Sequence, residues 1–232
     1  MTLSTPGLVL HTTPYGESSV VAHVFTRLSG VRSYIIKGVR TSRGRIKQNL
    51  LQPLSSLDMV VYNNNRNDLN HVKELSSRHP ELQPDPVDNA LRFFMTEVLY
   101  KSLQQAEPMP ALWDYVENEE WRGDGDLKDV PIRFMLTVAH HLGIEPLDNY
   151  SVREPLFDLQ EGRYVAVATE TTLSPALSSM LHEYLYNYNV QFSTFNLNER
   201  RSLIDALIAY YQLHLSGFHN FNSHEILHTI LR

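Results

Sequence analysis

Positively charged side chains follow one another closely between residues 31 and 47 of this chain. They are Arg32, Lys37, Arg40, Arg43, Arg45 and Lys47. No acidic residue occurs between Glu17 and Asp58. Lys and Arg side chains bind phosphates and displace counterions without reading base sequence. The Thr, Ser and Gly between the later cations are typical of a loop that wraps a polyanion, although a solvated surface loop has the same composition. We predict that these cations contact the backbone of a nucleic acid.

One aromatic residue, Tyr34, stands two positions after Arg32. In an extended strand these two side chains share a face. Aromatic rings stack on nucleic-acid bases, and each such contact is worth ~1–3 kcal/mol. We therefore add Tyr34 to the predicted binding set. Tyr15, Phe25 and Tyr62 are weaker candidates, because aromatic residues in small barrels more often pack than bind.

No catalytic or metal-binding set accompanies the cations. The chain has no cysteine, which excludes disulfides and thiolate metal sites. No phosphate-binding glycine loop, nucleophile elbow or zinc-protease motif occurs. His224 and His228 are four residues apart and could share a helix face, but a metal site also needs a third ligand and supporting partners. We predict no enzymatic activity, no cofactor and no bound metal.

Short strands separated by turn residues surround the cations. The expected strands are residues 7–13, 19–26, 31–39, 57–62 and 69–75, the last of which could equally form a helical turn. Val31 to Gly38 alternates in the period of two that strands require. Five strands in about 70 residues, with a long loop after the third, favour a small closed barrel of the OB type. An SH3-like barrel has the same pattern.

Proline marks the end of the barrel region, at Pro80, Pro84 and Pro86. We place a domain boundary there, which gives residues 1–79 as an OB-fold domain and 80–232 as a helical domain. The expected helices are residues 87–105, 111–121, 130–142, 174–188, 198–215 and 223–231. We expect Asn198 to cap the fifth of them and Gly143 to end the third. A small hairpin around Glu161 and Gly162 interrupts the helices. The fold class is therefore α+β.

Charge divides the chain in the same place. Residues 1–78 carry ten Lys and Arg against four acids, and residues 79–232 carry ten against 22, within a total net charge of −6. A basic part joined to an acidic part indicates two kinds of partner. No apolar run approaches the ~20 residues that span a bilayer, and the first residues lack the charged and apolar regions of a signal peptide. We expect a soluble cytoplasmic protein, associated with the nucleoid, without a membrane partner.

Several short stretches resemble the RecO family of recombination mediators. They are residues 9–11, 15–18, 25–26 and 37–40 near the start, and 210–215, 217–218 and 223–231 near the end. The resemblance covers nearly the whole chain in order. It implies an N-terminal OB fold, a helical C-terminal domain, binding of single- and double-stranded DNA, and annealing of complementary strands. The implied direct partners are RecR and single-strand DNA-binding protein. RecA recombinase is implied as an indirect partner, whose loading onto DNA the protein assists.

One departure from the family concerns metal. Many members carry a four-cysteine zinc ribbon within the helical domain, whereas the corresponding region here, residues 147–169, has no cysteine. Because zinc ribbons need thiolate ligands, we predict that the hairpin of this region forms without zinc. Any role of the ribbon itself does not carry over to this chain.

Two hypotheses of different class follow. The first is a non-enzymatic mediator of recombinational repair that neutralises two DNA backbones at once. The alternative is a protein–protein adaptor whose barrel binds RNA or a peptide and whose helices organise a complex. Candidate anchors of a protein interface on the helical domain are Trp113, Trp121, Phe93 and Tyr184, although burial in helix packing is the better expectation for each.

Overall fold

The computed structural model describes residues 2–41, 48–62, 69–79, 85–104, 106–123, 126–186 and 195–230. The chain divides into two compact units, residues 1–118 and 119–232. Each is treated by itself below.

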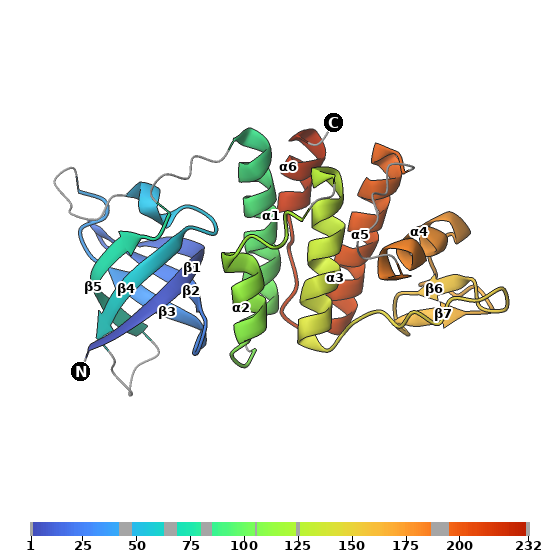
Figure 1. The fold of residues 1–232 in the computed structure, drawn as a ribbon, viewed down its shortest axis with the longest axis horizontal. Helices are drawn as coiled ribbons and strands as arrows, with labels where there is room; N and C mark the ends of the chain where they lie inside the picture. The colour runs from blue at the N-terminus through green and yellow to red at the C-terminus, as the bar shows by residue number, and fades with distance from the viewer. Residues whose placement is uncertain are drawn as a thin grey trace. The chain divides into compact units, whose positions relative to one another are not determined.

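Strands β1 to β5 of the first unit close into a barrel, with the order β1-β2-β3-β5-β4 and β4 returning to β1 (Figure 1). The strands are β1 (Thr2–Tyr15), β2 (Ser19–Thr26), β3 (Gly30–Ile36), β4 (Ser56–Tyr62) and β5 (Leu69–Ser77), and a short 3-10 helix, η1 (Gln48–Leu51), precedes β4. All neighbours are antiparallel except β3 and β5, which run parallel. This pairing confirms the OB-type barrel expected from the sequence, and helices follow it, as predicted.

The barrel core follows from the alternation of β2 and β3. Ala22 and Val24 on β2 are buried, and Ala22 lies opposite Tyr34 in the register of the two strands. Tyr34 and Ile36 of β3 belong to the same cluster, which is completed by residues of the other strands. Because side chains of a strand alternate between its faces, one set of positions fills the interior while the other faces outward.

Two helices complete the first unit. Helix α1 (Pro86–Ser102) packs on β1, and the side chain of Asp85 caps its start by accepting a hydrogen bond from the backbone of Asp88. Helix α2 (Pro110–Glu117) is joined to the barrel by Trp113, whose indole N–H donates to the carbonyl of Phe25 at 3.0 Å. The first compact unit thus contains these two helices together with the barrel.

The second unit is mostly helical. Its elements are η2 (Leu127–Asp129), α3 (Val130–Leu142), α4 (Pro175–Tyr186), α5 (Leu197–His214) and α6 (Ser223–Ile230), with a two-stranded hairpin of β6 (Leu156–Asp158) and β7 (Arg163–Val165). Gly143 ends α3 with φ +72°, the left-handed conformation that glycine adopts without strain. The cap of α5 is Asn196, not Asn198 as expected, because Glu199 three residues later completes a capping box with it. Across the described ranges, no helix is long and apolar enough to cross a membrane.

A buried ion pair joins two elements of this unit. The guanidinium of Arg200 on α5 donates to the carboxylate of Asp129 on η2 at 2.7 Å, and both side chains are almost fully buried. The hydroxyl of Tyr184 on α4 donates to the same carboxylate oxygen at 2.6 Å. Burial and this bond raise the pKa of Tyr184 well above its ordinary value. One carboxylate therefore binds three elements together.

Candidate nucleic-acid interface

Strand β3 positions two of the predicted DNA-binding cations. Arg32 lies opposite Val24 of β2 and is exposed, and Lys37 directly follows the last residue of the strand and is also exposed. At about 3.3 Å per residue the two backbone positions are roughly 16 Å apart. Among the described residues neither cation has an ion-pair partner. Both charges are therefore free to bind phosphates.

A third predicted cation, Arg40, is partly committed to the barrel itself. Its guanidinium donates to the carbonyl of Gly16 at 3.0 Å, and its backbone N–H donates to the carbonyl of Ser18 at 3.1 Å. These bonds hold the segment after β3 against the turn between β1 and β2. Because a guanidinium has five N–H donors, the exposed side chain still has donors for a phosphate. Arg43, Arg45 and Lys47 lie outside the described residues.

The prediction that Tyr34 stacks on a base is wrong. Its side chain is only 4% exposed and lies in the barrel core beside Ile36. Arg32 and Tyr34 do lie on the same face of β3, but that face turns toward the barrel interior. Arg32, which is near the start of the strand, remains exposed. Burial raises the pKa of Tyr34, and the charge of Arg32 opposes that change. A ring without an exposed face cannot bind a base.

The other aromatic candidates divide between packing and exposure. Phe25 is 1% exposed and therefore packs, as expected for most of them. Tyr15 at the end of β1 and Tyr62 at the end of β4 are about half exposed. These two rings remain available for stacking.

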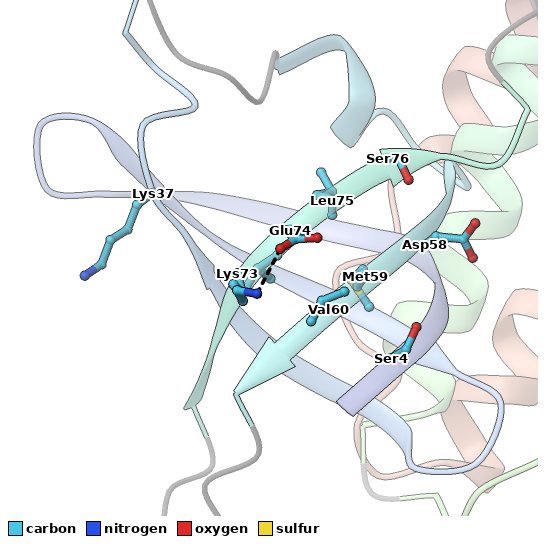
Figure 2. A pocket seen from close by; sticks show the side chains of 10 residues that line it. Ser4, Lys37, Asp58, Met59, Val60, Lys73, Glu74, Leu75 and Ser76 are labelled. Atoms are coloured by element: carbon cyan, nitrogen blue, oxygen red, sulfur yellow. Dashed lines mark ion pairs between the residues drawn. The ribbon is translucent and has the colours of Figure 1, made fainter. Parts of the chain in front are cut away.

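A hollow on the barrel opens beside Lys37 (Figure 2). Its volume is about 560 Å³, and β4 and β5 form most of its wall. The lining residues are Ser4, Lys37, Asp58, Met59, Val60, Val72, Lys73, Glu74, Leu75 and Ser76. The apolar side chains could accept a flat base, while the ammonium group of Lys37 could bind the phosphate that accompanies it. One of the predicted cations, Lys37, is thus part of this concave surface.

Most charges around this hollow neutralise one another. Lys73 and Glu74 form an ion pair at 3.0 Å, and hydrogen bonding to Glu74 raises the pKa of Lys73. Asp58 accepts a hydrogen bond from Arg78 at 2.8 Å. Lys37 is the lining cation for which the described residues provide no such partner, and Figure 2 shows its side chain extending away from the strands. A polyanion would therefore be attracted chiefly by Lys37.

Sequence reasoning missed Lys73 as part of this surface. Residues 69–75 fitted both a strand and a helical turn, so the face on which Lys73 falls was left open. The pairing of β5 with β4 decides it, since Glu74 lies opposite Val60 and Val72 opposite Val61. Lys73 is therefore the extra residue of a β-bulge, and both Lys73 and Glu74 line the hollow.

No metal site can be built from the described side chains of the second unit. In the ranges that the structure describes, no three His, Asp or Glu side chains come together in a way that could hold a metal ion. His224 and His228 do lie together, with ring centroids 5.6 Å apart, but they lack a third ligand.

The hairpin of β6 and β7 lies in the region that the resemblance matched to a zinc ribbon, and its residues do not fit that metal. Its centre is the buried carboxylate of Asp158, which accepts hydrogen bonds from the backbone N–H groups of Gln160 and Glu161, both at 2.9 Å. The hydroxyls of Thr169 and Thr171 donate to it as well. These donors occupy the oxygens that a metal would need, and thiolates are absent from the sequence. Hydrogen bonds to one carboxylate hold this hairpin together.

A closed OB-type barrel followed by a helical unit defines a class of proteins in which an OB fold carries an appended helical domain. Comparison with known proteins identifies the family within this class. A family model described as Recombination protein O N terminal matches residues 1–80. The DNA repair protein RecO of Porphyromonas gingivalis is 32% identical over 99% of both chains. The proteins of that name from Flavobacterium johnsoniae and Bacteroides fragilis are 27% and 24% identical over nearly their whole lengths.

These similarities extend over the barrel and the helical unit alike. The chain therefore belongs to the RecO family, which confirms the resemblance seen in its short motifs.

Proposed function

We propose that the protein is a non-enzymatic, DNA-binding mediator of recombinational DNA repair. It binds single- and double-stranded DNA and anneals complementary strands. With RecR it promotes the loading of RecA recombinase onto DNA coated by single-strand DNA-binding protein. It acts in the cytoplasm, at the nucleoid. Its membership of a family whose relatives are named DNA repair proteins supports this role.

The observation that carries the proposal is a pair of exposed cations, one within β3 and one directly after it. Arg32 and Lys37 face solvent on a barrel of the type that binds single strands, and they have no ion-pair partner among the described residues. With Arg40, Arg43, Arg45 and Lys47 they would neutralise phosphates on two strands at once. Repulsion between the strands then falls, and base pairing proceeds without a nucleotide cofactor.

A strand-annealing assay tests the proposal. Two complementary oligonucleotides, one carrying a fluorophore and the other a quencher, are mixed with the protein, with and without single-strand DNA-binding protein. The protein should accelerate annealing in both cases. The double variant Arg32→Ala/Lys37→Ala should lose most of this acceleration, because the phosphates lose two binding partners.

The matched control is Arg153→Ala/Arg163→Ala, which removes the same charge from exposed residues of the second unit. It should anneal like the unchanged protein. Equal loss in both double variants would mean that net charge alone governs annealing. Failure of the unchanged protein to bind or anneal DNA, even at low salt, would favour the adaptor function.

The partner steps need a separate assay. RecA filament formation on DNA coated by single-strand DNA-binding protein is measured with the protein and RecR added singly and together. The proposal requires that filaments form faster only when both are present. An equal rate of filament formation without the protein would contradict the proposed mediator role, and the proposed annealing activity would be unaffected.

A further inference from the structure

Three aromatic side chains form a row on the second unit, which we call the aromatic ledge: Tyr150, His182 and Tyr186. The rings of Tyr150 and His182 are stacked, with centroids 4.3 Å apart, and the ring of Tyr186 lies 5.7 Å from that of His182. Tyr186 is 73% exposed and Tyr150 is 37% exposed. Large aromatic rings that remain this open are typical of binding surfaces.

The packing beneath the ledge fixes its position. Tyr150 rests edge-on against the buried ring of Tyr164 on β7, at 5.3 Å. The neighbouring Asn149 donates to the carbonyl of Tyr164 and accepts from its N–H, at 3.0 and 2.8 Å. Helix α4 carries His182 and packs on β6 (Figure 1). The exposed rings are thus held in place before any partner arrives, which lowers the entropy lost on binding.

Two carboxylates lie at the ledge. Asp148 bonds the imidazole of His182 at 2.7 Å, and Glu154 accepts a hydrogen bond from Asn149, the neighbour of Tyr150, at 3.0 Å. Carboxylates attract cations and repel phosphates. The side chains of Leu147 and Val152, which are within three residues of Tyr150 in the sequence, are exposed and add apolar area.

We propose that the aromatic ledge binds an arginine-containing segment of a partner protein. Tyrosine faces attract a cation at close range. The planar guanidinium stacks on an aromatic ring and donates to carboxylates at its edge, whereas the compact ammonium group of Lys does not stack. The acids Asp148 and Glu154 complement the charge of such a segment. This inference concerns a different surface from the DNA contact and stands independently of it.

Fluorescence anisotropy with the full chain at low salt tests the proposal. The probes are three labelled twelve-residue peptides with alternating Gly, in which the other positions are all Arg, all Lys or all Glu. The Arg peptide should bind several-fold more tightly than the Lys peptide of equal charge, and the Glu peptide should not bind. Equal affinity for the Arg and Lys peptides would overturn the proposal, because it would leave only attraction between point charges.

Variants locate the site. Tyr186→Ala changes a highly exposed residue and should weaken binding of the Arg peptide about three- to fivefold. This is the loss expected when one cation–π contact at an exposed site is removed. Tyr186→Phe should keep most of the affinity, because it keeps the ring. Tyr150→Ala should weaken binding to a similar degree, and circular dichroism checks that the variant is folded. The control is Tyr15→Ala, which removes an exposed tyrosine from the barrel and should leave affinity for the Arg peptide unchanged.

Other occupants give distinct results. If both ledge variants bind the Arg peptide as the unchanged protein does, the proposal fails. If Tyr186→Ala instead weakens binding of a single-stranded oligonucleotide, the ledge belongs to a nucleic-acid-binding surface. If sedimentation shows self-association that Tyr186→Ala abolishes, the occupant is a second copy of the chain. Either of the last two results would replace the proposed partner.

Discussion

Arginine is used in opposite ways in the two units. On the barrel, Arg32 is exposed and has no ion-pair partner among the described residues. In the helical unit, Arg200 is buried against Asp129, with a bond of 2.7 Å. Burial disfavours the charged form of Arg200, but its hydrogen bond and attraction to Asp129 outweigh this, so its pKa stays above the ordinary value.

This difference separates binding from folding. A cation that is already paired inside the chain has little left for a ligand, whereas one that faces water keeps its full charge for a phosphate. Removing Arg200 should therefore change stability and leave DNA affinity alone, and removing Arg32 should do the reverse.

The largest effect is expected for Arg200→Met. The change leaves the carboxylate of Asp129 buried without its cation, which costs about 3–5 kcal/mol of unfolding free energy. Urea unfolding is followed by the fluorescence of Trp121, in a Trp113→Phe background so that the second unit alone reports.

The triple variant Arg200→Met/Asp129→Leu/Tyr184→Phe serves as the control. It should recover a large part of the loss, because apolar groups replace both members of the pair and the hydroxyl that bonds to Asp129. A loss below about 1 kcal/mol in the single variant would contradict the account of this pair, because it would fall in the range of exposed ion pairs.

Asp158→Asn should lower the free energy of unfolding by a smaller amount, about 2 kcal/mol, because hydrogen bonds to a charged group are worth about 1.5–3 kcal/mol. Burial opposes ionisation of Asp158, but bonds from Thr169, Glu161, Thr171 and Gln160 outweigh it and lower its pKa. The sign follows: the stabilisation is complete above the unfolded pKa of about 4 and is lost as pH falls through the lower folded pKa.

Hydrogen exchange in residues 156–173 measures this effect between neutral pH and pH 2. Protection should fall in the acid range for the unchanged protein, and Asp158→Asn should already be less protected at neutral pH. Equal protection of both proteins at neutral pH would show that the carboxylate does not hold the hairpin.

The smallest effect on DNA affinity is expected for Tyr34→Leu, which removes the ring but keeps an apolar side chain in the barrel core, with circular dichroism to check that the variant is folded. Because the ring is buried, the change should leave affinity for single-stranded DNA within about twofold, well below the ~1–3 kcal/mol of a stacked base. A tenfold loss in an oligonucleotide titration would restore Tyr34 as a base-binding residue.

The regular elements were largely predictable from local pattern. The expected strand 19–26 and helix 130–142 agree with β2 and α3 to the residue, because alternation and a glycine cap fix their limits. Alternation also showed that Arg32 and Tyr34 share a face. It could not show that this face turns inward, because barrel closure brings β3 to β5, a strand more than 30 residues later.

Long-range hydrogen bonds were equally hidden. Gly162 indicated the hairpin, but Asp158 is stabilised by Thr169 and Thr171, which come from beyond β7. Likewise, no local signal paired Asp129 with Arg200, 71 residues away. The aromatic ledge brings Tyr150 to His182 through the packing of α4 on β6, which the sequence pattern does not specify.

The salt dependence of single-stranded DNA binding tests the central claim most directly. Each phosphate contact adds ~0.7 to the slope of log affinity against log salt. The variant Arg32→Ala/Lys37→Ala should therefore reduce the slope by about 1.4 and leave unfolding unchanged, while Arg153→Ala/Arg163→Ala keeps the original slope. An unchanged slope in the barrel variant would contradict the assignment of these two cations to DNA.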